Sequence, residues 1–172
     1  MAALRKLLDG LYLFGGIMGA LSLVIILLLV VLQMVARWVG EVAPGIPEYA
    51  GYFMASSAFL AFAYALNKGS HIRVNLLLQA VGSGKKWVEI WCFAIGSGLA
   101  VYFSYYAIKA VFWSHKLNDI SQGQDATPIW IPQLSMAVGA VLLAIAMVDH
   151  LLQLIFTGEH GIEADTLDSH AE

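Results

Sequence analysis

The residues of this chain that could carry chemistry are its five histidines, its single cysteine and a few carboxylates. Two histidines facing each other across a helical bundle could ligate a haem between them. Here every histidine falls in a loop, at the end of an apolar stretch or in the C-terminal tail: His71, His115, His150, His160 and His170. We therefore expect solvated side chains and no haem. No group of them has the spacing of a zinc site.

The cysteine and the carboxylates are placed no better for catalysis. Cys92 has no second cysteine with which to form a disulfide or a redox pair, and its apolar neighbours predict a small buried residue. A membrane-embedded glutamate could couple transport to protons, as in small drug exporters. Glu48 and Glu89, however, lie at the edges of apolar stretches. The sequence therefore predicts no enzyme, and no metal or cofactor bound by this chain.

The secondary structure that positions these residues can be inferred from the apolar composition, with 60% hydrophobic and 12% charged residues. Four uncharged stretches are long enough to cross ~30 Å of hydrocarbon as helices at ~1.5 Å per residue. We predict an all-α membrane protein with four transmembrane helices in a bundle, spanning 11–36, 48–67, 87–113 and 129–156. These spans form a single membrane domain of residues 1–157, and we interpret the first as an uncleaved signal anchor.

Two segments outside the spans have patterns that predict their structure. In residues 70–81, polar side chains recur every fourth position at His71, Asn75 and Gln79, opposite a broad apolar face. This pattern favours a short amphipathic helix lying flat in the membrane interface, where Lys68 and Arg73 would bind anionic phospholipid headgroups. A plain loop is the alternative. Residues 158–172 are acidic and predict a disordered tail.

The distribution of basic residues predicts the orientation. Six fall on the side that holds both termini and three on the other: Arg5, Lys6, Lys68, Arg73, Lys85 and Lys86 against Arg37, Lys109 and Lys116. The positive-inside rule places both termini in the cytoplasm. Tryptophans near the span ends, including Trp87 and Trp130, are typical of membrane-interface anchors. Pro47 and Pro128 mark helix starts, with Thr127 a candidate N-cap.

Small residues recur at spacings of three or four within the spans, for example at Gly15 and Gly19 and at Ala137, Ala140 and Ala144, with Gly139 beside them. Such spacing lets helix backbones approach closely in lipid. The contacts could close the bundle or dock a partner, and the sequence does not separate the two.

Four short segments together resemble one transporter family. They are Arg37 after the first span, Pro47-Glu48 before the second, the run Gly69 to Asn75 (Gly-Ser-His-Ile-Arg-Val-Asn) after it, and Thr127 to Pro132 before the fourth. The chain resembles the small, DctQ-like membrane subunit of tripartite ATP-independent periplasmic (TRAP) transporters over nearly its whole length. Asn75 stands where the family's signature run more often has an acid.

The resemblance implies a scaffold in the bacterial inner membrane. Its partners would be a large M-type membrane subunit, which holds the substrate and sodium sites, and a periplasmic substrate-binding protein. No nucleic acid is expected. Arg37, Glu48, His71 and Arg73 are our candidates for contacts with a subunit or for positioning in the membrane, with lipid headgroups as the alternative partner. The competing hypothesis is a membrane anchor of a respiratory enzyme that binds haem or quinone.

Overall fold

The computed structural model describes residues 2–41, 44–68 and 85–157. These residues form the four helices α1 (Ala2–Val39), α2 (Ile46–Asn67), α4 (Lys85–Lys116) and α5 (Trp130–Thr157). Each is long and apolar enough to cross a membrane. The predicted all-α membrane protein with four helices is thereby confirmed. The predicted interfacial helix at 70–81 and the acidic tail at 158–172 lie outside the described residues.

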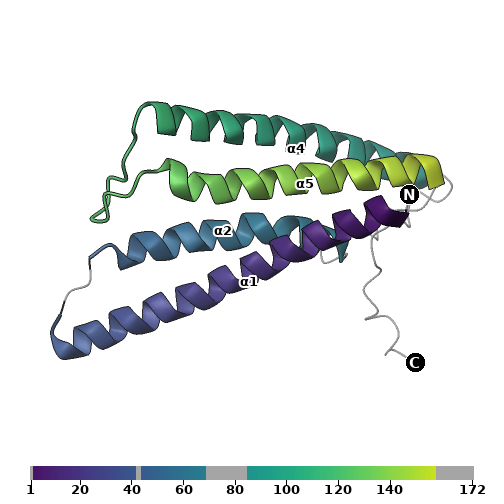
Figure 1. Ribbon diagram of the computed structural model, residues 1–172. Coiled ribbons are helices and arrows are strands. Elements are labelled where there is room, and N and C mark those ends of the chain that lie inside the picture. Colours follow the sequence, from purple (N-terminus) through teal and green to yellow (C-terminus); the bar gives the residue numbers. More distant parts are fainter. Residues whose placement is uncertain (1, 42–43, 69–84, 158–172) are drawn as a thin grey trace, which may run out of the picture.

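The helices lie side by side in an open row rather than around a common axis (Figure 1). α1 packs on α2, α2 on α5 and α5 on α4, while α1 and α4 make no contact in the described residues. α1 and α4 are therefore the two edges of the row. The connections after α1 and α4 share one end, here called the loop end. The N-terminus lies at the other, here called the N-terminal end.

The residues at the helix ends explain most of the boundaries. α1 stops at Gly40, whose positive φ of 85° lets the amides of Gly40 and Glu41 bond back to the last carbonyls of the helix. α2 begins after Gly45 with Pro47 in its first turn, as predicted. The predicted N-cap role of Thr127 is wrong. α5 starts only at Trp130, and the Thr127 hydroxyl bonds Tyr49 instead.

Close approaches of the backbone hold the row together. A Cβ on Gly139 of α5 would lie 2.5 Å from the Phe59 carbonyl oxygen of α2, and one on Gly15 of α1 would lie 2.7 Å from that of Leu60. Only glycine fits at such distances, so the small residues noted in the sequence serve contacts within the chain at these positions. The core lies where α1, α2 and α5 meet: Tyr12, Ala63, Leu66, Leu142 and Ala146.

Serine hydroxyls add polar contacts between the helices. The Ser56 and Ser135 hydroxyls lie 2.6 Å apart and join α2 to α5. Ser104 of α4 donates to the Ala140 carbonyl of α5 at 2.8 Å. Since lipid offers no hydrogen-bonding partners, these bonds satisfy groups that would otherwise be costly at this depth. Cys92 is exposed on α4, so its predicted burial is wrong, because its side of the helix is not covered by α5.

Candidate functional site

The connection between α4 and α5, residues 117–129, is an ordered structure that we call the cap loop. Its two arms are bridged at Ile120 and Pro128. The Ser121 amide donates to the Thr127 carbonyl at 2.8 Å, and the Ile129 amide donates to that of Asp119 at 3.0 Å. The cap loop therefore has its own hydrogen-bonded ladder and can present a fixed surface at the loop end.

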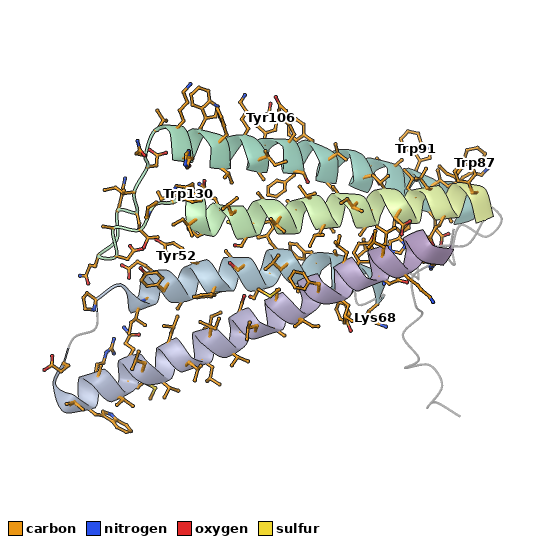
Figure 2. The ribbon with its side chains drawn as sticks, in the orientation of Figure 1. Tyr52, Lys68, Trp87, Trp91, Tyr106 and Trp130 are labelled. Carbon is orange, nitrogen blue, oxygen red and sulfur yellow. The ribbon has the colours of Figure 1, made fainter. Side chains whose placement is uncertain are left out.

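Tyr52 ties the cap loop to α2 (Figure 2). Its hydroxyl lies 2.8 Å from Ser121 Oγ and 2.9 Å from Asp125 Oδ2. A phenol carries one proton and an ionised carboxylate only accepts, so the Tyr52 proton is best donated to Asp125. The Ser121 hydroxyl is the second polar group within hydrogen-bonding distance of the Tyr52 oxygen. Charge-assisted bonds of this kind are stronger than neutral ones and fix the loop against the helix.

Two further contacts come from the first turn of α2. The Tyr49 and Thr127 hydroxyls are 3.0 Å apart. The backbone N–H of Gln124 donates to Glu48 Oε1 at 3.4 Å, which is at the long limit for such a bond. Glu48, a site residue chosen from the sequence, is thus placed against the cap loop. The arrangement is a polar joint that lacks a nucleophile paired with a base.

The hydrogen bonds around Asp125 alter its acidity. Burial disfavours the charged form, but hydrogen bonds from Thr127, Ser121 and Tyr52 outweigh this effect and lower the pKa of the Asp125 carboxyl. Because the pKa is lower in the folded state than in the unfolded state, the carboxylate stabilises the cap loop above about pH 4. That contribution is lost as the pH falls through the folded value.

We therefore expect Asp125→Asn to lower the melting temperature in detergent at pH 7 and to flatten its fall between pH 7 and pH 3. Asp119→Asn is the control. Asp119 is an exposed residue of the same loop, and its replacement should leave the wild-type pH dependence unchanged. If Asp125→Asn kept the full pH dependence, the proposed role of the carboxylate would be wrong.

A second polar joint connects α1 and α5 at the N-terminal end. Arg5 Nη1 donates to Gln153 Oε1 at 3.2 Å, and Gln153 Nε2 donates to Asp149 Oδ2 at 2.9 Å. His150 is 1% exposed and lies against Phe93 of α4, with ring centroids 6.3 Å apart. The prediction of a solvated His150 is wrong because α5 continues beyond it to Thr157 and turns this residue inward.

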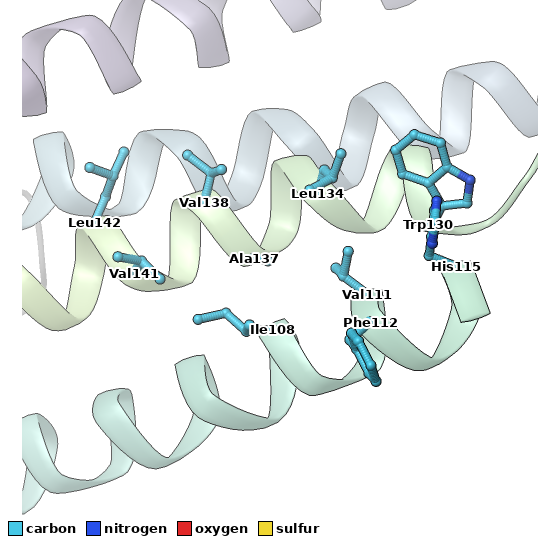
Figure 3. A pocket seen from close by; sticks show the side chains of 10 residues that line it. All are labelled: Ile108, Val111, Phe112, His115, Trp130, Leu134, Ala137, Val138, Val141 and Leu142. Atoms are coloured by element: carbon cyan, nitrogen blue, oxygen red, sulfur yellow. The ribbon is translucent and has the colours of Figure 1, made fainter. Parts of the chain in front are cut away.

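An apolar groove of about 560 Å³ lies between α4 and α5 near the loop end (Figure 3). His115 and Trp130 stand at one end of it with their rings at a near-right angle, 5.2 Å apart. The remaining lining is apolar: Ile108, Val111, Phe112, Leu134, Ala137, Val138, Val141 and Leu142. The groove can accommodate hydrocarbon, but it lacks the converging polar groups that position a hydrophilic substrate.

The other site residues chosen from the sequence are scattered. Arg37 lies exposed in the last turn of α1. Trp87 is 71% exposed at the end of α4 that lies farthest from the cap loop (Figure 2). Trp130 lines the groove, next to the cap loop. His71 and Arg73 lie outside the described residues. Of the described members of this set, Glu48 is in direct contact with the cap loop, and the assigned roles stay predictions.

The residues missed by sequence reasoning are those that join segments far apart in the chain. Tyr52 and Asp125 are separated by 73 positions, and Arg5 and Gln153 by 148. A signal was nevertheless present, because Ser121, Asp125 and Thr127 give the connection before α5 several short hydrogen-bonding side chains.

A comparison with protein families identifies the family of this chain. The family described as "Tripartite ATP-independent periplasmic transporters, DctQ component" matches residues 26–157. This range includes residues 26–39 of α1, all of α2, α4 and α5, and the cap loop. Searches of curated proteins and of solved structures gave no significant match.

Proposed function

The chain belongs to the DctQ component family of TRAP transporters, and from this premise we propose that it is the non-catalytic small subunit that braces the large M-type membrane subunit. Transport then takes place in the large subunit, driven by sodium and supplied with an organic acid by the periplasmic binding protein. Membership of the family implies association with both partners. Sodium coupling, the class of substrate and the bracing role are parts of the proposal.

The observation that carries the bracing role is the way the row is held. Backbone contacts at Gly15 and Gly139 join its helices at mid-length, and polar joints tie them at both ends. A chain built in this way can keep a constant shape and depth while a neighbour moves, which a brace requires. The exposed Trp87 and the half-buried joint around Tyr52 would fix its position at the two membrane surfaces.

The alternative of a haem-binding respiratory anchor gains no support. Two histidines are among the described residues, and they lie at opposite ends of the row. His150 is packed near Phe93 at the N-terminal end, and His115 is packed against Trp130 at the loop end. They cannot share one haem as a pair of axial ligands.

The experiment for the proposed function is uptake into proteoliposomes under an inward sodium gradient. Radiolabelled succinate and sialic acid are the probes. We expect uptake of one probe when the chain is reconstituted with the large subunit and the binding protein, and none from the chain alone. Uptake that is unchanged when this chain is left out would contradict a bracing role, and uptake by the chain alone would contradict the assignment as a scaffold.

We further propose that both termini face the cytoplasm and that the cap loop faces the periplasm, where it helps to dock the binding protein. With Cys92 replaced by serine, a cysteine introduced by Gln122→Cys should react with a membrane-impermeant maleimide in intact cells. Gln122 is exposed at the tip of the cap loop. The binding protein should slow this labelling several-fold. Labelling only after the membrane is broken would reverse the orientation, and labelling unaffected by the binding protein would exclude docking at this tip.

A further inference from the structure

Three tyrosines form a stripe along the outer face of α4. Tyr105 and Tyr106 follow Tyr102 by three and four positions, which places the three rings on one side of the helix. They are 62%, 62% and 47% exposed. The ring of Tyr106 lies 4.7 Å from that of Tyr102 and 5.3 Å from that of Tyr105, centroid to centroid. Figure 2 shows Tyr106 in the half of α4 nearer the cap loop, on the side away from α5.

Contacts between the helices place this tyrosine stripe near the middle of the membrane. Ser104, within the stripe, bonds Ala140 of α5, and the adjoining Gly139 lies against Phe59 of α2. Ser104 and Phe59 are each within about one turn, ~5 Å, of the midpoints of their own helices. The hydrocarbon extends ~15 Å to either side of the bilayer centre. The three phenol groups therefore lie at hydrocarbon depth.

Phenol hydroxyls are poorly suited to lipid at this depth. Tyrosines that face lipid gather at the headgroup level, where the hydroxyl meets water. Within the described part of the chain, the hydroxyls of the tyrosine stripe make no hydrogen bonds. An unsatisfied polar group in hydrocarbon is costly. The stripe therefore requires hydrogen-bond acceptors from outside the described chain.

The opposite edge of the row has a different character. The exposed side chains of α1 at mid-length are all hydrocarbon: Leu13, Phe14, Ile17, Leu21, Leu23, Val24, Leu27 and Leu28. The mean hydropathy of the α1 span is 2.8, against 1.3 for the α4 span. Surface suited to lipid is thus found on α1, and the polar surface lies on the α4 edge.

We infer that the tyrosine stripe is the surface on which the large M-type subunit docks, through a membrane helix that presents hydrogen-bond acceptors at mid-depth. Lys109 continues the stripe one turn further, with its Nζ 5.8 Å from the centre of the Tyr106 ring, and adds a positive charge to the same edge. A partner helix with carbonyl or hydroxyl oxygens at mid-depth and an acidic group nearer the loop end complements this pattern. The inference rests on the proposed function.

Photocrosslinking tests the inference with a control at matched depth. Ile17, which is 56% exposed, corresponds in depth to Tyr106, because Gly15 lies against Leu60 just as Gly139 lies against Phe59. p-Benzoylphenylalanine is placed at position 106 or 17, and the chain is co-expressed with the large subunit. We expect crosslinks to the large subunit from position 106 alone. Crosslinks from position 17, from neither position, or to a second copy of this chain would overturn the inference.

A second measurement removes only the hydroxyls. The triple substitution Tyr102→Phe, Tyr105→Phe and Tyr106→Phe should weaken binding of the large subunit by about 25-fold, at about threefold for each interhelical hydrogen bond in a membrane. Binding equal to wild type would overturn the inference. If the wild-type chain itself failed to bind the large subunit, the proposed function would fall. The two failures are therefore distinguishable.

Discussion

Replacing Gly139 with leucine is expected to force α5 away from α2 and to lower the melting temperature in detergent by about 5–10 °C. A Cβ at this position would lie 2.5 Å from the Phe59 carbonyl oxygen. The obstacle is main chain, which cannot rotate aside as a side chain can. Since α2 and α5 form the central contact of the row, the substitution should separate the α1–α2 pair from the α5–α4 pair.

The loss of this contact can be measured directly. Ser56 and Ser135 are close enough for cysteines at both positions to form a disulfide, and Cys92→Ser removes the native thiol. Gly139→Leu should abolish most of that crosslink. Gly51→Leu is the control, because a Cβ on Gly51 of α2 meets no atom within 4 Å. Equal melting temperatures and equal crosslinking in the two variants would show that the close α2–α5 approach is not required.

Replacing Gly15 with leucine should detach α1 from α2. The new Cβ would lie 2.7 Å from the Leu60 carbonyl oxygen and 3.3 Å from Leu142 Cδ1. We expect a fall in melting temperature of about 3–8 °C. Because α1 is the edge opposite the tyrosine stripe, binding of the large subunit should persist.

A disulfide across the α1–α2 contact reports this change. A Cβ on Gly19 would lie 3.1 Å from the Cβ of Ala61, so cysteines at these two positions should crosslink in a Cys92→Ser background. Gly15→Leu should reduce that crosslink, and Gly10→Leu should not, because a Cβ on Gly10 meets no atom within 4 Å. A Gly15→Leu variant that loses the large subunit would contradict the assignment of α1 as the lipid-facing edge.

Uncharged apolar runs and the residues that begin or end helices were enough to predict the four helices. The uncharged run after Asp9 and the proline at Pro47 are local signals, and the helices follow them. The order of the helices in the row could not be obtained in this way. Which small residues meet a neighbour depends on pairing between distant segments. Gly139 and Gly51 look alike in sequence, yet a Cβ on Gly139 would meet Phe59, whereas a Cβ on Gly51 would meet no atom within 4 Å.

The same limit applies to the candidate site. Glu48 was selected from the sequence, but its contact with the cap loop depends on where residues 117–129 fold back. His150 was misjudged for a related reason. Its place near the end of an apolar run suggested water, whereas the residue is 1% exposed and Phe93 of α4 lies against it. Sequence periodicity gives the face of a helix, and tertiary contacts decide what covers that face.

Co-purification tests the central claim most directly. The tagged chain, co-expressed with the large subunit of its own transporter and purified in mild detergent, should elute as a stable complex with that single, much larger and very hydrophobic polypeptide, and without a haem absorption band. Elution of this chain alone under conditions where both proteins are folded would contradict the account, as would a stoichiometric haem band in the purified complex.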